Sequence, residues 1–368
     1  MSASARAPHA TPGAPDGGKA SGAGPIISFE GVDIVFGSDP KSALPLVDEG
    51  LPRTEIARRT GQTVGVAGAT LDVAEAETLV LMGLSGSGKS TLLRAVNGLA
   101  PVIRGRTLVR GGNGGMIDPA TCSSRRLRAL RQQRVAMVFQ QFGLLPWRTV
   151  VQNVGFGLEL SGVPATQRHE RAMRQLEVVG LQDRADALVG ELSGGMQQRV
   201  GLARALATEA PILLMDEPFS ALDPIVRSKL QDDLLALQSD LRRTIVFVSH
   251  DLDEAFKIGD RIAIMEGGRI VQVGSPGDIA RSPATQYVAD FVSHMNPLSV
   301  LAARDVMRPP DRGDGSMTHA LSGSATPDTP VSQIMAALKA RPGAVAVIEK
   351  GTIVGTISAA DVVAALSD

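Results

Sequence analysis

The stretch TLVLMGLSGSGKSTLLRAVN, residues 78–97, decides the fold of this chain. A strand-length apolar run leads into a glycine-rich turn that fits the pattern G-x-x-x-x-G-K-[S/T], and a helical pattern follows. Such glycines let backbone N–H groups surround phosphate oxygens, and the helix N-terminus adds partial positive charge. We therefore predict that nine residues bind a nucleotide: Gly83, Leu84, Ser85, Gly86, Ser87, Gly88, Lys89, Ser90 and Thr91.

A second apolar run, 212–215, ends in two carboxylates, Asp216 and Glu217. Alone, they fit the solvated end of a strand equally well. Because the same chain contains a phosphate loop, the functional interpretation is favoured. Asp216 is then expected to hold Mg²⁺ together with the hydroxyl of Ser90, and Glu217 to polarise the attacking water, as phosphoryl transfer from a nucleotide requires.

The composition narrows the class of protein. The 368 residues, 43% hydrophobic and 20% charged, allow about two domains with sizeable cores. With 37 Lys and Arg against 38 Asp and Glu, the net charge is −1, so no nucleic-acid partner is expected. Cys122 is the single cysteine, which excludes a disulfide framework and a cysteine-based zinc site.

The chain shows no predicted membrane span. No window holds 18 uninterrupted apolar residues. Residues 1–26 are rich in Ala, Gly, Pro and Ser and lack the apolar segment of a secretory signal, so we expect a disordered leader. A cytoplasmic protein that reaches a membrane through a partner is expected.

The remaining pattern predicts an α/β fold in two parts. Apolar runs at 78–82, 212–215 and 244–248, separated by helical stretches, are typical of a parallel sheet covered on both faces. An amphipathic helix at 164–180 lies within about 142–200, which we interpret as a helical insertion. We expect a main domain over 27–280. A C-terminal extension over 281–368 contains a linker and a small α+β unit, with a hairpin that turns at Lys350-Gly351.

A second anion-binding pattern lies at 192–198, LSGGMQQ. Ser193 and two glycines open a helix that runs from about Met196 to Ala207, which places backbone N–H groups and a capping hydroxyl at one helix N-terminus. Two such helix starts in one chain indicate that the nucleotide is gripped from two sides.

Six motifs therefore stand in order: the phosphate loop, VFQQ at 138–141, LSGG at 192–195, MDEP at 215–218, SALD at 220–223 and VSHD at 248–251. In this order they resemble the ATPase domain of ABC transporters, a P-loop NTPase fold, over roughly 27–280. The resemblance implies a head-to-tail dimer in which each ATP lies between one phosphate loop and the partner's signature residues: Leu192, Ser193, Gly194, Gly195, Met196 and Gln197.

The resemblance also implies individual roles. Glu217, His250 and Gln140 are expected to be catalytic, and Gln140 joins Ser90 and Asp216 around Mg²⁺. Asp223 is expected to act across the dimer. ABC ATPases stack adenine on an aromatic residue before the first core strand, and Phe36 is the candidate here. An ordinary core phenylalanine is an equally open interpretation.

Further features resemble one subgroup, the importer ATPases for quaternary amines such as choline, glycine betaine and proline betaine. They are Met196 in the signature, the segment of about 25 residues from Gly37 to Gln62, FGLLPWRTV at 142–150 and YVADFV at 287–292. The choline branch is the best match. Because ATPases for amino acids, taurine or nitrate share most of the motifs, another small solute remains an alternative, and a soluble ABC ATPase outside transport is a more distant one.

The C-terminal unit resembles one repeat of a CBS (cystathionine-β-synthase) regulatory module, through Asp305-Val-Met307, Pro330-Val331 and residues 345–366. CBS repeats act in pairs, so this copy either pairs with that of a second subunit or is vestigial. The resemblance as a whole implies ATP and Mg²⁺ as cofactors. It implies as partners a second copy of the chain, two copies of a membrane permease near Trp147 and, indirectly, a periplasmic or lipid-anchored substrate-binding protein. The expected location is the cytoplasmic face of the inner membrane.

Overall fold

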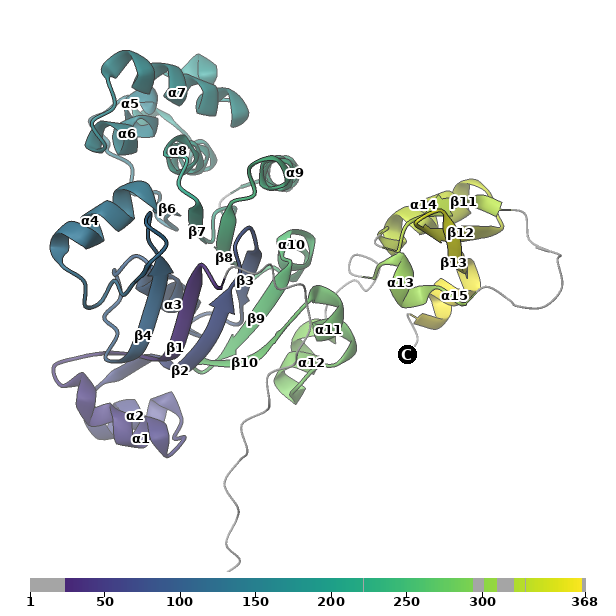
Figure 1. The fold of residues 1–368 in the computed structure, drawn as a ribbon, viewed down its shortest axis with the longest axis horizontal. Helices are drawn as coiled ribbons and strands as arrows, with labels where there is room; N and C mark the ends of the chain where they lie inside the picture. The colour runs from purple at the N-terminus through teal and green to yellow at the C-terminus, as the bar shows by residue number, and fades with distance from the viewer. Residues whose placement is uncertain (1–23, 221, 294–300, 310–320, 328, 366–368) are drawn as a thin grey trace, which may run out of the picture.

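The structure, a computed structural model, describes residues 24–220, 222–293, 301–309, 321–327 and 329–365. The predicted leader falls almost wholly outside these residues. Ile26, its last member, is buried, and its N–H donates to the Val73 carbonyl at 2.9 Å. Figure 1 shows a region of two sheets with helices above it, and a separate small unit at the C-terminus.

A six-stranded sheet forms the centre of the ATPase-like region, in the order β10-β9-β3-β8-β7-β6. All neighbours from β9 to β6 pair in parallel, and β10 runs antiparallel to β9. The predicted parallel sheet is confirmed, since its three predicted strands are the neighbours β3, β8 and β7. The strands are β3 (Thr78–Met82), β6 (Val135–Val138), β7 (Ile212–Asp216), β8 (Thr244–Val248), β9 (Arg261–Glu266) and β10 (Arg269–Gly274).

An antiparallel sheet packs beside it in the order β2-β1-β4-β5. Its strands are β1 (Ile27–Phe36), β2 (Thr63–Val73), β4 (Arg104–Arg110) and β5 (Met116–Ile117). The segment between β1 and β2 folds into η1 (Pro40–Ala43), α1 (Leu44–Asp48) and α2 (Arg53–Thr60). Its apolar residues share a cluster of their own with both strands: Val35, Ala43, Val47, Ile56, Val64 and Ala67.

A group of helices lies above β6 and β7, at the top of Figure 1. Thr149 and Gln152 form a capping box that starts the first of them, which explains why the chain turns helical there. The helices are α5 (Val150–Val154), α6 (Phe156–Leu160), α7 (Ala165–Val178), η2 (Gln182–Arg184), η3 (Val189–Glu191) and α8 (Gly194–Ala207). The predicted helix at 164–180 is α7.

Other helices cover the sheets: α3 (Lys89–Ala95), α4 (Ser124–Gln133), α9 (Pro224–Leu241), α10 (Leu252–Ile258), α11 (Pro276–Arg281) and α12 (Gln286–Ser293). The helix α12 lies beyond the predicted domain boundary at 280. Its Val288 is nevertheless fully buried in the main hydrophobic core, and its Tyr287 hydroxyl accepts a 3.2 Å hydrogen bond from the Leu84 N–H.

The C-terminal unit has its own core. Its sheet has the order β11-β12-β13, from β11 (Leu321–Ala325), β12 (Ala344–Glu349) and β13 (Thr352–Ser358). The helices are α13 (Ala303–Val306), α14 (Val331–Ala340) and α15 (Ala359–Ala365). Lys350 and Gly351 turn the chain between β12 and β13 as predicted, both with positive φ. Among the described residues of the whole chain, no helix is long and apolar enough to span a membrane.

Candidate nucleotide site

Four neighbouring parallel strands bring the predicted residues together. In the order β3-β8-β7-β6, the strand ends lead into the phosphate loop, His250, the pair Asp216 and Glu217, and Gln140. Because the carboxyl ends of parallel strands lie at one edge of a sheet, side chains far apart in the sequence meet there. This edge is the usual position of ligands in α/β sheets.

The phosphate loop has the backbone that glycine permits. Gly83 has a φ of +138° and Gly88 a φ of +104°, and β-carbons there would lie 2.1 Å from the Met265 carbonyl oxygen and 2.3 Å from that of Gly65. Lys89 is buried, and its Nζ donates to the carbonyls of Gly83 at 2.8 Å and Leu84 at 3.0 Å. Burial lowers the pKa of this ammonium group, and the carboxylates of Glu217 and Asp216 oppose that effect.

Asp216 is fully buried and makes two charge-assisted contacts. The Ser90 hydroxyl donates to Oδ1 at 2.6 Å, and the Arg94 guanidinium pairs with Oδ2 at 2.9 Å. Ser90 and Arg94 are four residues apart on α3, so both face the same carboxylate. Hydroxyl and carboxylate oxygens this close fit Mg²⁺, which takes few protein oxygens and completes its shell with phosphate and water. Arg94 had not been predicted, although its spacing from Ser90 is visible in the sequence.

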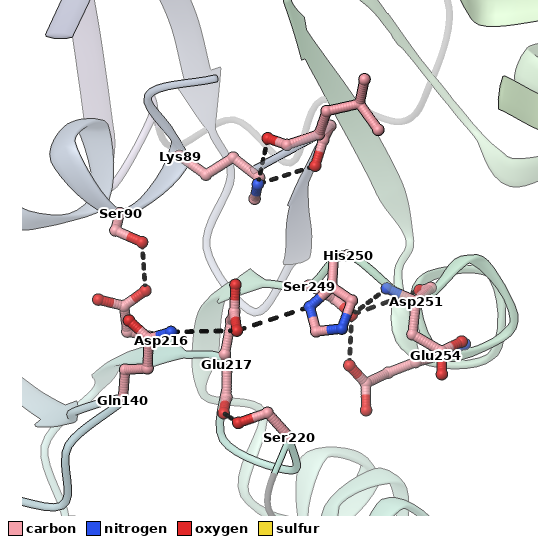
Figure 2. Close-up of polar contacts among 12 residues, drawn as sticks. Lys89, Ser90, Gln140, Asp216, Glu217, Ser220, Ser249, His250, Asp251 and Glu254 are labelled. Carbon is pink, nitrogen blue, oxygen red and sulfur yellow. Dashed lines mark hydrogen bonds and ion pairs between the residues drawn. The ribbon is translucent and has the colours of Figure 1, made fainter. Parts of the chain in front are cut away.

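Glu217 lies between Gln140 and His250 (Figure 2). Gln140 Nε2 donates to Glu217 Oε2 at 3.3 Å, and His250 Nδ1 lies 3.5 Å from the same oxygen. The backbone of Glu217 has a φ of +49°, a conformation that costs a non-glycine residue roughly 1–3 kcal/mol. Such strain persists only where surrounding structure imposes it, and it clusters at functional sites.

A polar network behind His250 had not been predicted. Glu254 accepts hydrogen bonds from the Ser249 hydroxyl at 2.5 Å and from Gln231 Nε2 at 3.1 Å. Asp251 pairs with Arg227 of α9 at 3.1 Å, so both neighbours of His250 are held. Burial raises the pKa of the Glu254 carboxyl, although its hydrogen bonds act the other way. The short spacing between Ser249 and Glu254 in the sequence was the available signal.

The signature residues lie apart from this cluster. Ser193 is exposed and caps α8, its hydroxyl accepting from the Met196 N–H at 3.4 Å. Gln197 donates to the carbonyls of Val189 and Leu192, both at 3.1 Å. Within the described part of the chain, no hydrogen bond or ion pair joins residues 192–197 to the phosphate loop.

Phe36 and Asp223 complete the set. Phe36 is 41% exposed, so the alternative of an ordinary core residue is wrong. A β-carbon built on Gly65 would lie 3.0 Å from the Phe36 ring and 2.9 Å from Thr91 Cγ2, which places the ring beside α3. Pairing of Phe36 with Thr63 brings it there despite the inserted segment. Asp223 caps α9, accepting from the N–H groups of Ile225 at 3.2 Å and Val226 at 3.0 Å.

Known proteins share both parts of this chain. Family models match at residues 66–220, described as ABC transporter, and at 303–368, described as CBS domain. The glycine betaine/proline betaine transport system ATP-binding protein ProV of Salmonella typhimurium is 49% identical, over 74% of this chain and 67% of that protein. The trimethylamine N-oxide transport system ATP-binding protein TmoW of Ruegeria pomeroyi is 45% identical over 80% and 85%. The choline transport ATP-binding protein OpuBA of Bacillus subtilis is 42% identical over 63% and 59%.

Among solved structures, the dimeric ATP-binding cassette MJ0796 in a post-hydrolysis state, bound to ADP and Pi, matches 68% of this chain and 98% of its own. Its TM-score is 0.58 at 28% identity. The chain therefore belongs to the ABC transporter family, as an ATP-binding subunit with an ATPase fold. Within that family it falls in the group of ATP-binding subunits that includes those of betaine and choline transport systems. The chain is 49% identical to ProV and 42% identical to OpuBA, and its assignment to the choline branch stays a prediction.

Proposed function

We propose that this subunit hydrolyses ATP to power an importer of a quaternary ammonium compound, glycine betaine or choline. The single observation that carries the proposal is the convergence of Lys89, Asp216, Glu217 and His250 at one sheet edge, in a chain 49% identical to a glycine betaine/proline betaine transport subunit. The subunit itself contacts ATP, while the cargo is chosen by other proteins.

Hydrolysis is proposed to depend on position and charge. Lys89 and the loop N–H groups hold the phosphates, and Phe36 stacks on the adenine. Glu217 polarises the attacking water, and His250 contacts the γ-phosphate. Gln140, which donates to Glu217, links the state of the nucleotide to the membrane subunit. Ser90, Asp216 and Gln140 would hold Mg²⁺, which when bound would neutralise part of the phosphate charge. Lys89 Nζ donates to two carbonyls of its own loop, which leaves the third N–H group of its ammonium for a phosphate oxygen.

The site is proposed to be completed by a second copy of the chain. The exposed cap at Ser193 offers unpaired N–H groups at a helix start, which suits the γ-phosphate on the opposite subunit. Trp147 is 73% exposed beside the helical region and is proposed to pack against one of two permease copies, on the cytoplasmic face of the inner membrane. A substrate-binding protein is an indirect partner.

Uptake of labelled solutes by a strain that lacks this gene, grown under osmotic stress, tests the proposed cargo. We expect the wild-type chain to restore uptake of radiolabelled glycine betaine or choline, and the Glu217→Gln chain to restore neither. Trimethylamine N-oxide serves as the third labelled solute because one relative is named for it. Uptake of that solute, taurine, nitrate or an amino acid alone would replace the proposed cargo.

A further inference from the structure

Arg53, the first residue of α2, lies against the phosphate loop. Its Nη1 donates a 2.5 Å hydrogen bond to the Gly86 carbonyl. A β-carbon built on Gly268 would lie 3.6 Å from Arg53 Cδ, and the Gly268 N–H donates to the Ser87 carbonyl at 3.1 Å. The arginine side chain therefore passes over the turn between β9 and β10 and ends on the loop.

No carboxylate pairs with Arg53 among the residues that the structure describes. Glu55, on the same helix, pairs instead with Arg58 at 2.6 Å and with Arg59 at 2.5 Å. Partial burial lowers the pKa of the Arg53 guanidinium, but arginine stays protonated in proteins. A full positive charge thus lies beside an anion-binding loop, offset only by a backbone dipole.

The inserted segment fixes the position of this charge. Ile56 of α2 is fully buried in the small cluster between the segment and β2. Arg104 joins Asp48 of α1 at 2.6 Å to Asp33 of β1 at 2.5 Å, and Arg269 donates to the Val47 carbonyl at 2.8 Å. Arg53 is therefore presented by a packed element and lies at a defined place on the loop.

We infer that Arg53 is a positioning residue of the nucleotide site, through which the inserted segment 37–62 sets the affinity for ATP. It fixes the main chain of the phosphate loop at Gly86 and adds a positive charge where ATP brings several negative ones. The inference rests on the phosphate-loop role proposed above and goes beyond it, because Arg53 belongs to none of the motifs.

The test compares two charge-removing variants of one helix in the full-length chain. Arg53→Met keeps the aliphatic stem against Gly268 and removes the charge, while Arg58→Met removes a charge on the exposed side. Binding of a fluorescent ATP analogue and steady-state ATPase rates are measured for both. We expect Arg53→Met to raise Kd and KM about three- to tenfold, with kcat within about twofold. Arg53→Lys should recover most of the affinity, and Arg58→Met should match the wild type.

Equal Kd and KM for Arg53→Met and Arg58→Met would overturn the inference. Thermal unfolding without nucleotide separates affinity from folding, because we expect the same melting temperature for both variants. If Arg53→Met is unstable, the Arg53→Lys variant decides. A wild-type KM for Arg53→Lys would show that the positive charge suffices and would support the role. A loss of ATP affinity that only matches the fraction of unfolded protein would refute it. The Lys89→Ala variant separates the two proposals. Normal ATP binding by Lys89→Ala would refute the phosphate-loop assignment itself. If Lys89→Ala loses ATP binding while Arg53→Met binds ATP normally, only the inference about Arg53 is refuted.

Discussion

Two sides of this subunit are built differently. The hydrolysis side is the set of strand ends that carries Asp216, Glu217 and His250, and the signature side is the start of α8 at Ser193. At the strand ends, Asp216, Glu217 and His250 contact other side chains of the same chain, and burial perturbs the pKa of Lys89 beside them. At the start of α8, the Ser193 hydroxyl contacts only its own helix and is exposed. A network that is internally satisfied suits chemistry, and an exposed helix cap suits docking to an anion from outside. The difference is that expected of a subunit that shares each ATP with a second copy.

Glu217→Gln is the largest expected perturbation of the hydrolysis side. The amide cannot accept a proton from water, so the turnover number should fall about a hundredfold or more while ATP still binds. Phosphate release gives the rate, and size-exclusion chromatography with ATP should show a trapped dimer. Glu177→Gln, on the exposed side of α7, is the matched control. Multiple turnover near the wild-type rate would remove Glu217 as the base.

Mixed dimers test the comparison directly. Ser193→Arg should block the signature side and, alone, lower hydrolysis as strongly as we expect for Glu217→Gln. A dimer of one Glu217→Gln chain and one Ser193→Arg chain keeps one intact site, formed by the Glu217 of one chain and the Ser193 of the other. In a statistical mixture half of the dimers are mixed, so about a quarter of wild-type activity should return.

The mixing experiment needs a check that subunits exchange, which co-purification through a tag on one chain provides. With exchange shown, activity no higher than that of either variant alone would mean that each site is complete within one chain. The two sides would then belong to a single site, and the proposed dimer would be wrong.

The motifs could be predicted because each depends on a local backbone. The glycines of the phosphate loop, the carboxylates after a buried strand and the serine before α8 are dictated by neighbours in the sequence, and the parallel sheet then determines which of them meet. The α/β class and its three predicted strands were confirmed for this reason.

What escaped prediction depends on distant packing. The contact of Arg53 with Gly86 requires the fold of the inserted segment, and the pairing of Asp251 with Arg227 requires α9 to pack against α10. The position of Phe36 near the phosphate loop could not be judged from its separation from Lys89 in the sequence. The antiparallel pairing of β1 with β2 brings Phe36 opposite Thr63, so the two ends of the inserted segment lie side by side. Similarly, the composition change near residue 280 does not reveal that α12 returns to the main core.

We expect the buried Glu254 to make the stability of the hydrolysis side depend on pH, an effect smaller than those of the two preceding variants. Because burial raises its pKa in the folded state, the carboxyl favours folding most when protonated. Its contribution to stability is full below the unfolded pKa and is lost as pH rises through the folded pKa. Each unit between those two pKa values corresponds to about 1.4 kcal/mol.

Glu254→Gln removes this titration. We therefore expect the stability of the variant, relative to wild type, to rise as the pH increases above the ordinary glutamate pKa of 4.5 in denaturant-unfolding experiments. The hydrolysis rate should fall only several-fold, since Glu254 acts through Ser249 and does not contact ATP. A stability difference that is constant across this pH range would show that the carboxyl is not titrated differently by folding.

The C-terminal unit stands outside both sides, so its removal should have the smallest effect. We expect a chain that ends at Ser293 to keep kcat and KM for ATP within about twofold, because it retains Val288 in the core and the Tyr287 hydroxyl on the phosphate loop. A chain that ends at residue 280 loses both contacts and should melt at a lower temperature and bind ATP more weakly. If both truncated chains bind ATP normally, α12 is dispensable for the nucleotide site. If the chain that ends at Ser293 also loses ATP binding, the CBS unit contributes to that site.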